Sequence, residues 1–311
     1  MEGGADSLLP KWGKIRSELE NTTGLSIIVQ PEMRDFTTWK VGGRALALVE
    51  VKDEEELDQV IFLCEKEGIR WKILGHGSNI LVKDEGFPGV VIRLKGNFCE
   101  LKREGNTVEG GGGASLFQLV SFALQEGLGG SEFLVGIPGT VGGAVRINAG
   151  CFGKEIGSLV ERVKVRWKSG KKEWLTRSCL TFSYRDSNLK QGEGTVILRS
   201  AFHLFPEDQK VSREKIKRFC YLRRERQPLE WPSAGSVFRN PPGDSAARII
   251  EEMGLKGLRV GKAQVSSKHS NFIVNLGGAK SWEIEYLMNW IQKEVYMNKN
   301  MWLEREVELW P

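Results

Sequence analysis

The alternation of apolar and polar positions predicts both strands and helices in the first half of the chain. A turn at Gly42-Gly43 leads into an apolar run over 45–51, which reads as a strand. After Asp53, a plausible N-cap, apolar residues recur at helical spacing as far as Gly68. Further strands are predicted over 71–74, 80–82 and 89–94, and a helix over 115–127.

The second half continues in the same way but keeps its strands and helices apart. Strands are expected over 159–168, 171–176 and 195–205, followed by a charged, proline-led break at 206–209. Beyond the break the pattern predicts helices over 215–227, 246–257 and 282–294, and strands over 270–276 and 302–310. This segregation favours an α+β fold with a domain boundary near 206.

Glycine is unusually frequent, with 37 residues, and it gathers in three banks near 75–77, 108–115 and 132–155. The last bank is expected to form neither helix nor strand, and a bound ligand would offset the entropy of ordering it. Gly75-x-Gly77 is followed by Ile80, Leu81 and Val82, which favour a strand rather than a helix. A nicotinamide-binding Rossmann loop is therefore disfavoured.

Composition narrows the class of protein. A chain of 311 residues, 40% hydrophobic and 27% charged, suggests a globular protein of two or three domains. No segment approaches a membrane span or a signal peptide, so we expect a cytoplasmic protein. Five scattered cysteines and three histidines predict neither disulfides nor a metal site. The net charge of +5 is mild. The basic face of the predicted helix at 215–227 is interpreted first as solvent-exposed and second as a site for ligands that carry phosphate. No nucleic-acid-binding motif accompanies it.

The segment 232–241, PSAGSVFRNP, carries the most specific candidate chemistry. Small residues surround Ser236, so the backbone can approach a ligand while the hydroxyl stays exposed. Alone, this could be an ordinary tight loop. It occurs together with YRDS at 184–187 and EREVE at 304–308.

These motifs, with LGHGSN at 74–79 and GIPGTVGGA at 136–144, resemble the UDP-N-acetylenolpyruvoylglucosamine reductase family from about Asn21 onward. The resemblance implies a two-part FAD-binding domain of the vanillyl-alcohol-oxidase (PCMH) type and a C-terminal α+β substrate-binding domain. The expected parts are an N-terminal lead (1–20), two FAD-binding subdomains (21–88 and 89–205) and the substrate domain (206–311), with the strand 302–310 packing back on the FAD domain. Only 50 residues separate Arg185 from Ser236, which resembles the shorter subgroup without a tyrosine-bearing insertion.

The resemblance also implies a non-covalent FAD, with NADPH as co-substrate. Some other proteins with this flavin-binding fold attach FAD covalently to a histidine. The reductase family binds FAD non-covalently, so His76 is expected only to line the loop. The glycine loops would hold the diphosphate through backbone N–H groups. The implied FAD-binding residues are Gly75, His76, Gly77, Ser78, Asn79, Gly136, Pro138, Gly139, Thr140, Gly142, Gly143, Asn148 and Gly150.

The reaction implied by the resemblance is reduction of an enolpyruvyl group on a UDP-linked amino sugar, a step in peptidoglycan precursor synthesis for cell-wall biogenesis, cell shape and division. Ser236 matches the family's proton donor, and Arg185 and Glu306 match residues that assist at the substrate carboxylate. Glu306 would have to be protonated or paired with a cation to help. Arg185 could instead pair with Asp186, and Glu306 could be one of three alternating glutamates on a strand.

Several further residues are expected to bind substrate. Arg226 and Asn240 match the diphosphate contacts, and Tyr184 precedes the candidate arginine; weaker candidates are Arg239, Lys256, His269 and Asn271. Cys151 replaces the more usual small residue of the family pattern near the flavin, and we interpret this as a conservative change in packing. No obligate protein partner is evident. A flavin oxidase on the same FAD domain, or a non-catalytic nucleotide-sugar or flavin-binding module, are the alternative functions.

Overall fold

A computed structural model of the chain describes residues 5–22, 25–190, 192 and 194–311. Residues 1–4 of the predicted lead lie outside this range. The described part of the lead forms helix α1 (Ala5–Thr22), which buries Trp12, Ile15 and Leu19 against the first sheet. The lead therefore contributes to a hydrophobic core.

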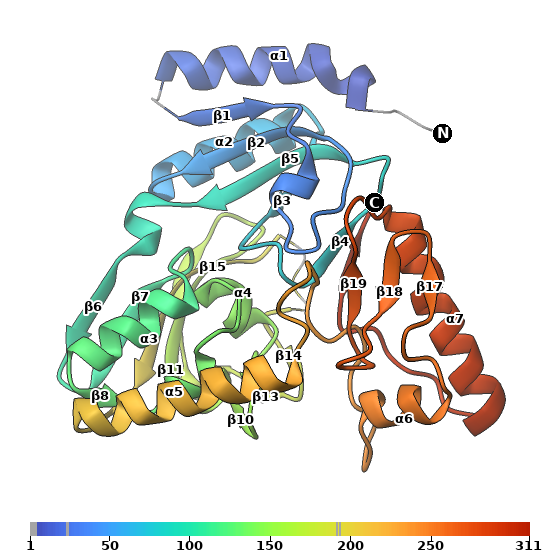
Figure 1. Ribbon diagram of the computed structural model, residues 1–311. Helices are drawn as coiled ribbons and strands as arrows, with labels where there is room; N and C mark the ends of the chain where they lie inside the picture. The colour runs from blue at the N-terminus through green and yellow to red at the C-terminus, as the bar shows by residue number, and fades with distance from the viewer. Residues whose placement is uncertain (1–4, 23–24, 191, 193) are drawn as a thin grey trace.

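The first sheet combines parallel and antiparallel pairing beneath α1 and α2 (Glu54–Lys66) (Figure 1). Asp53 caps α2 as expected, accepting hydrogen bonds from the backbone N–H groups of Glu55 and Glu56. The strands of this sheet lie in the order β1 (Ser26–Val29), β2 (Ala45–Val51), β5 (Phe87–Leu94) and β3 (Arg70–Ile73).

The second sheet is antiparallel throughout and packs against α3 (Leu116–Gln125), which Ser115 caps with a capping box. Its strands follow the order β12 (Lys172–Thr176), β11 (Val160–Arg166), β15 (Val196–His203), β7 (Thr107–Gly111) and β6 (Leu101–Glu104). Short strand pairs surround it: β8 (Leu128–Gly129) with β16 (Phe205–Pro206), β9 (Gly150–Cys151) with β10 (Lys154–Glu155), and β13 (Phe182–Ser183) with β14 (Asp186–Ser187).

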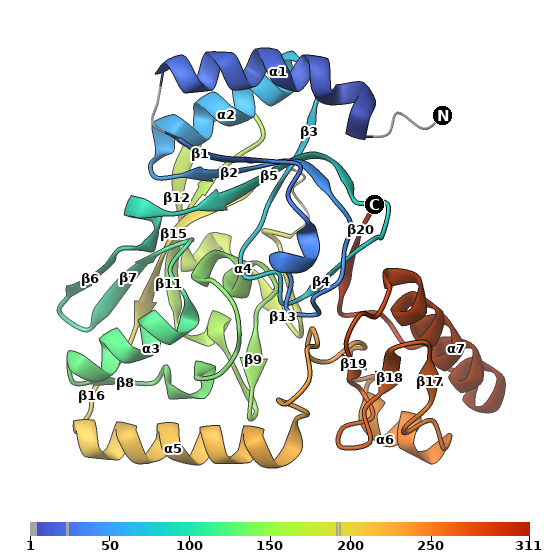
Figure 2. The same cartoon turned by 45° about the horizontal axis from the view of Figure 1, so that its top comes forward.

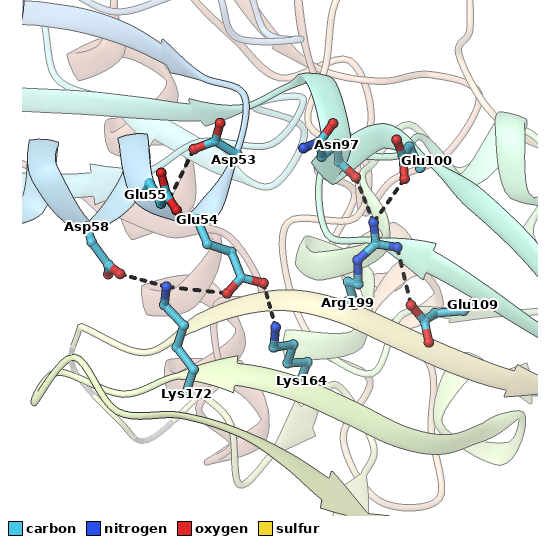
Figure 3. Close-up of polar contacts among 10 residues, drawn as sticks. All are labelled: Asp53, Glu54, Glu55, Asp58, Asn97, Glu100, Glu109, Lys164, Lys172 and Arg199. Carbon is cyan, nitrogen blue, oxygen red and sulfur yellow. Dashed lines mark hydrogen bonds and ion pairs between the residues drawn. The ribbon is translucent and has the colours of Figure 1, made fainter. Parts of the chain in front are cut away.

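Ion pairs connect the first sheet's helix α2 to the second sheet (Figure 3). Glu54 pairs with Lys164 at 2.6 Å, and Asp58 pairs with Lys172 at 2.6 Å. Burial raises the pKa of Glu54, but the hydrogen bonds and charges of Lys164 and Lys172 outweigh this effect and hold it below its ordinary value. These contacts help fix the two sheets relative to one another.

One expectation about the glycine-rich region was wrong. Residues Val141–Arg146 form a short helix, α4, whose N-cap Thr140 accepts a hydrogen bond from the Gly143 N–H at 3.3 Å. The glycines allow this helix to pack closely, because a Cβ at Gly142 would lie 3.0 Å from the carbonyl oxygen of Gly112. Val141 and Val145 are buried beneath it, so packing overrides the poor helix propensity.

Helix α5 (Gln209–Arg226) begins earlier than the sequence predicts and lies beyond the expected boundary at 206. Its residues Ile216 and Phe219 nevertheless pack on the core of the second sheet. In Figures 1 and 2 the helix starts beneath α3 and runs along the second sheet's side of the molecule toward the last part of the chain. The chain's change from one core to the next thus follows α5.

The last part has its own core around a three-stranded antiparallel sheet (Figure 2). Helices α6 (Ala246–Glu252) and α7 (Ser281–Lys299) pack on strands β17 (Arg259–Val260), β18 (Ala263–Val265) and β19 (Ile273–Asn275). The chain then returns, and β20 (Glu308–Trp310) pairs in parallel with β4 (Ile80–Val82). This return brings the C-terminal segment beside the loop at 75–79. The α+β fold class is confirmed, and a strand follows that loop as predicted.

Candidate active site

A large cavity lies between the two sheets and the C-terminal part. Its volume is about 1980 Å³, whereas a typical small-molecule site encloses roughly 300–1,000 Å³. The loop at 75–79 and the glycine-rich loop at 136–143 line it together with the Ser236 loop and the segment 305–308. The cavity therefore has room for a large cofactor and a second ligand side by side.

The loop at 75–79 presents a row of backbone donors. The N–H groups of Gly75, His76, Gly77 and Ser78 make no hydrogen bond to any residue that the structure describes. Gly77 adopts a φ of 63°, and a Cβ there would lie 2.2 Å from the carbonyl oxygen of Phe36, so only glycine fits. Consecutive free amides in such a turn form a concave anion site.

The second loop lies against the first. Ser78 Oγ donates a short hydrogen bond to the carbonyl oxygen of Pro138. Within the described part of the chain, the N–H groups of Gly139 and Thr140 have no partner and reach the same cavity. The two loops therefore form a single cradle of backbone donors, the kind of site that a diphosphate requires.

Two of the predicted FAD-binding residues, Asn148 and His76, differ in whether they reach the cavity. Asn148 is completely buried and does not line the cavity: its amide binds Glu155 and the carbonyl oxygen of Ser183, and its Oδ1 accepts from Gly157 N–H. Asn148 stabilises the backbone on the side of the loop that faces away from the cavity. The expectation that its side chain contacts the cofactor therefore does not fit the structure. His76 lines the cavity, and burial followed by the charges of Arg93 and Lys95 lowers its pKa, which keeps the imidazole neutral.

Arg185 and Glu306 meet at the cavity wall. Arg185 occupies the turn between β13 and β14 with a φ of 55°, and its Nε donates to Glu306 Oε1 at 2.7 Å. Its Nη2 donates to the carbonyl oxygen of Gly150 at 3.0 Å. Arg185 thus pairs with Glu306 at the cavity wall rather than with Asp186.

The environment of Glu306 sets its protonation. Burial raises the pKa of the Glu306 carboxyl above its ordinary value, while the nearby guanidinium of Arg185 works against that rise. Of the three alternating glutamates, the side chains of Glu304 and Glu308 are 71% and 50% exposed, against 14% for Glu306. Glu304 pairs with Arg239 and Glu308 with Lys72, both at the surface. The structure therefore singles out Glu306.

Ser236 lies on the neighbouring backbone segment. Gly235 precedes it with a φ of 76°, and the carbonyl oxygen of Val237 accepts a hydrogen bond from the Glu306 N–H at 2.8 Å. Ser236 is partly exposed and lines the same cavity as Arg185 and Glu306. The three predicted catalytic residues are thus brought together from distant parts of the chain.

The predicted substrate-binding residues divide into two groups. Tyr184 and Asn240 line the cavity, and the Tyr184 hydroxyl accepts a hydrogen bond from the Asn240 N–H at 3.3 Å. Arg226, at the end of α5, is exposed and lies outside the described lining of the cavity. His269 lines the cavity, whereas Asn271 is a buried clamp that binds the backbone of Phe238 on both sides.

One cavity residue was missed in the sequence. Arg223 is 7% exposed; its Nε donates to the carbonyl oxygen of Val135 at 2.9 Å, and its buried Nη2 has no partner among the described residues. Burial lowers its pKa, and no carboxylate among the described residues opposes this effect. The signal was present, because Arg223 falls at i+7 from Ile216, on the buried stripe of a helix read as having a solvated cationic face.

A diphosphate cradle facing a buried arginine and a catalytic-type serine–arginine–glutamate set defines a nucleotide-dependent enzyme, and the comparisons specify its class. Residues 45–175 match the family model described as an FAD binding domain. Residues 227–310 match the model for the C-terminal domain of UDP-N-acetylenolpyruvoylglucosamine reductase. The protein is accordingly a flavoprotein, and the expected cofactor is confirmed.

Relatives with known names are similar in sequence to this chain over nearly its whole length. A reductase of this name from Symbiobacterium thermophilum is 43% identical, covering 89% of this chain and 90% of the relative, and one from Moorella thermoacetica is 40% identical, covering 95% and 97%. A crystal structure of the reductase (MurB) from Thermus caldophilus matches with a TM-score of 0.79 at 38% identity, covering 92% of this chain and 99% of that one. The chain belongs to the UDP-N-acetylenolpyruvoylglucosamine reductase family.

Proposed function

We propose that this chain is a UDP-N-acetylmuramate dehydrogenase, which uses NADPH to reduce the enolpyruvyl group of UDP-N-acetylenolpyruvoylglucosamine in peptidoglycan precursor synthesis. The observation that carries the proposal is the convergence of Ser236, Arg185 and Glu306 on a cavity whose other wall is the FAD cradle. When bound, FAD accepts hydride from NADPH and supplies it to the substrate alkene.

Arg185 stabilises charge on the substrate. Hydride addition to the terminal methylene leaves negative charge on the adjacent carbon, which spreads into the carboxylate. Its ion pair with Glu306 and its bond to Gly150 fix the guanidinium before substrate binds, so little reorganisation is needed in the transition state. The other three guanidinium N–H groups have no partner among the described residues and are available to the substrate carboxylate.

Glu306 acts as a hydrogen-bond donor or as the anchor of Arg185. An ionised carboxylate next to an enolate would oppose the reaction. Burial raises the pKa of Glu306, and Arg185 opposes that rise. When protonated, the carboxyl can donate to the substrate carboxylate; when ionised, it anchors Arg185.

Ser236 delivers the proton that completes the reduction. An alcohol is a weak acid, but a carbanion is a much stronger base, so the transfer runs downhill. The hydroxyl is held on a loop whose backbone is bonded to the Glu306 segment, which places donor and carboxylate-binding groups on one rigid wall. A fixed donor also determines the stereochemistry of the product.

The diphosphate of UDP binds toward α5 and the Asn240 loop. Arg223 supplies a buried cation whose Nη2 has no partner among the described residues, while Tyr184 and Asn240 supply polar groups that line the same cavity. Arg226 remains a prediction from family position. The carbonyl Oδ1 of Asn240 already accepts from the Ala246 N–H, which leaves its amide N–H₂ as the donor for substrate.

We further propose that FAD is bound non-covalently, that the enzyme works in the cytoplasm without an obligate protein partner, and that its product supports cell shape and division. No helix in the described part of the chain is long and apolar enough to cross a bilayer. Denaturation followed by filtration tests the cofactor linkage: all the yellow colour should pass through the filter, and retention of colour with the chain would contradict it.

Single-turnover spectroscopy tests the function itself. NADPH should bleach the visible flavin absorbance anaerobically, and the enolpyruvyl sugar nucleotide should restore it much faster than oxygen does. Rapid reoxidation by oxygen, with no response to the sugar nucleotide, would point to a flavin oxidase. A colourless preparation that cannot be reconstituted with FAD would reject both.

A further inference from the structure

The outer face of α7 exposes an unusual row of large side chains. Its buried face packs on the C-terminal core through Ile284, Leu287, Met288, Ile291 and Val295. The opposite face and the adjoining loop expose six residues by 37% to 72%: Trp282, Tyr286, Trp290, Tyr296, Met297 and Trp302. We call these six residues the aromatic stripe.

The aromatic stripe is one continuous surface. At 3.6 residues per turn, its five helical members fall within an arc of about 120° and span about 22 Å along the helix axis. Ring contacts preorganise it, with Tyr286 on Trp290 at 5.9 Å and Tyr296 on Trp302 at 6.2 Å between centroids. In Figures 1 and 2 α7 lies at the outer edge of the C-terminal part, with no other element over it.

The composition of this face indicates whether it binds a lipid surface or another protein. Tryptophan and tyrosine also favour membrane interfaces, but binding to an anionic lipid surface requires an excess of lysine and arginine. Apart from the buried Glu283, helix α7 carries two glutamates and two lysines, so it has no cationic excess. Protein interfaces are instead rich in tryptophan, tyrosine and methionine and poor in charge at their centre.

The stripe is complementary to itself when two copies run antiparallel. A twofold axis between positions 289 and 290 places Trp282 opposite Met297 of a second copy, a sulfur–aromatic pair. The same axis places Tyr286 opposite Lys293, a cation–π pair. Lys293, a charged residue of α7 near the middle of the stripe, thereby gains an aromatic partner. Arg305, which reaches Asn289 from the neighbouring segment, is already paired with Glu285.

The size of the stripe suits a stable pair. Taking roughly 150–250 Å² for each large side chain, its exposed fractions amount to about 700 Å² per copy. A standard interface buries about 800 Å² per partner. We propose that the aromatic stripe is the interface of a homodimer in which α7 of one copy packs antiparallel on α7 of a second copy.

Sedimentation velocity of the FAD-loaded full chain tests the dimer. The wild type should sediment with twice the mass of one chain at tens of micromolar. Tyr286→Glu and Trp290→Glu should each weaken self-association by about 30-fold or more, because they place an unpaired charge in the interface centre. Phe62→Glu, which changes a still more exposed aromatic residue on α2, should remain dimeric. Unchanged flavin content shows that each variant is folded.

Cross-linking tests the antiparallel register. Asn289→Cys lies next to the proposed twofold axis and should form a disulfide-linked dimer under mild oxidation, above the background of wild type with its exposed Cys179 and Cys220. A wild type that is monomeric at 100 µM, about the upper end of weak association, would overturn the proposal. So would a dimer that survives both stripe variants, or a failure of Asn289→Cys to cross-link. A monomer that binds vesicles of phosphatidylglycerol and phosphatidylcholine would assign the stripe to lipid instead.

Discussion

Arg185 Nε and Glu306 Oε1 lie 2.7 Å apart although 121 residues separate them in the chain. One residue comes from a turn beside the FAD cradle and the other from the segment that returns after α7. The pair therefore connects the C-terminal part to the FAD-binding part, and it can form only when both parts are folded and packed together.

Glu306→Gln keeps the shape of this contact but removes the acid. We expect the rate of substrate-dependent flavin reoxidation to fall about 10²-fold, the size seen when one group that stabilises transition-state charge is lost, because the amide is a weaker donor than the acid and has no charge to anchor Arg185. Reduction of the flavin by NADPH should change little. Both half-reactions are measured by stopped-flow absorbance.

Glu304→Gln is the matched control for that experiment. Glu304 is two residues away, and its side chain is 71% exposed. Its substitution should leave both half-reactions within about twofold of wild type, as expected for a surface position. Equal losses in the two variants would show that the segment, rather than the Glu306 carboxyl, matters.

The raised pKa of Glu306 also predicts a pH dependence of stability. Above about pH 4.5, the ordinary value, the folded state retains a proton that the unfolded state has released. The free energy of unfolding therefore decreases as the pH rises through the interval up to the folded-state pKa. Glu306→Gln lacks this titration, so its urea-unfolding curve should lose less stability than wild type over the same interval.

Two observations check that assignment. The difference in unfolding free energy between wild type and Glu306→Gln should level off once the pH exceeds the folded-state pKa. Glu304→Gln should follow the wild-type profile. A constant difference at every pH from 4 to 8, the range in which such a carboxyl titrates, would show that Glu306 is not perturbed.

Ser236→Ala separates the two half-reactions most sharply. NADPH should still bleach the flavin at the wild-type rate, because the hydroxyl takes no part in that step. Reoxidation by the sugar nucleotide should slow by at least 10²–10⁴-fold, the usual contribution of a positioned proton donor. The same variant thus supplies its own control, and equal slowing of both steps would reassign Ser236 to binding.

The sequence predicted most elements and much of the site because both depend on short-range patterns. The stripe of α2, its Asp53 cap and the strand after Gly77 are local features, and the structure confirms them. The choice among Glu304, Glu306 and Glu308 was not local, since their alternation is identical and only the partners Arg239, Arg185 and Lys72 distinguish them.

The errors have physical reasons as well. Helix α4 forms in a glycine-rich segment because close packing on Gly112 outweighs propensity. Asn148 belongs to a cofactor motif, yet its amide is fully occupied by the loop behind the cavity. A motif identifies which residues belong together, but the hydrogen-bond partners of each one decide whether it faces the ligand.

Arg223 and Arg226 offer a direct comparison between structure and family position. Arg223 is buried at the cavity, and its Nη2 has no partner in the part of the chain that the structure describes, whereas Arg226 is exposed on the last turn of α5. Loss of a charge-assisted hydrogen bond costs about 1.5–3 kcal/mol. Arg223→Gln should therefore raise the KM for the UDP-linked substrate by about 10- to 100-fold, and Arg226→Gln should raise it by less.

Controls distinguish binding from folding, because Arg223 also holds the carbonyl oxygen of Val135. Arg223→Lys retains the charge but loses the fork geometry, so it should give a KM between wild type and Arg223→Gln. Thermal unfolding of the FAD-loaded variants and their rates of flavin reduction by NADPH should stay close to wild type. If Arg226→Gln alone raises KM while Arg223→Gln does not, the diphosphate lies at the end of α5, closer to solvent than the buried guanidinium.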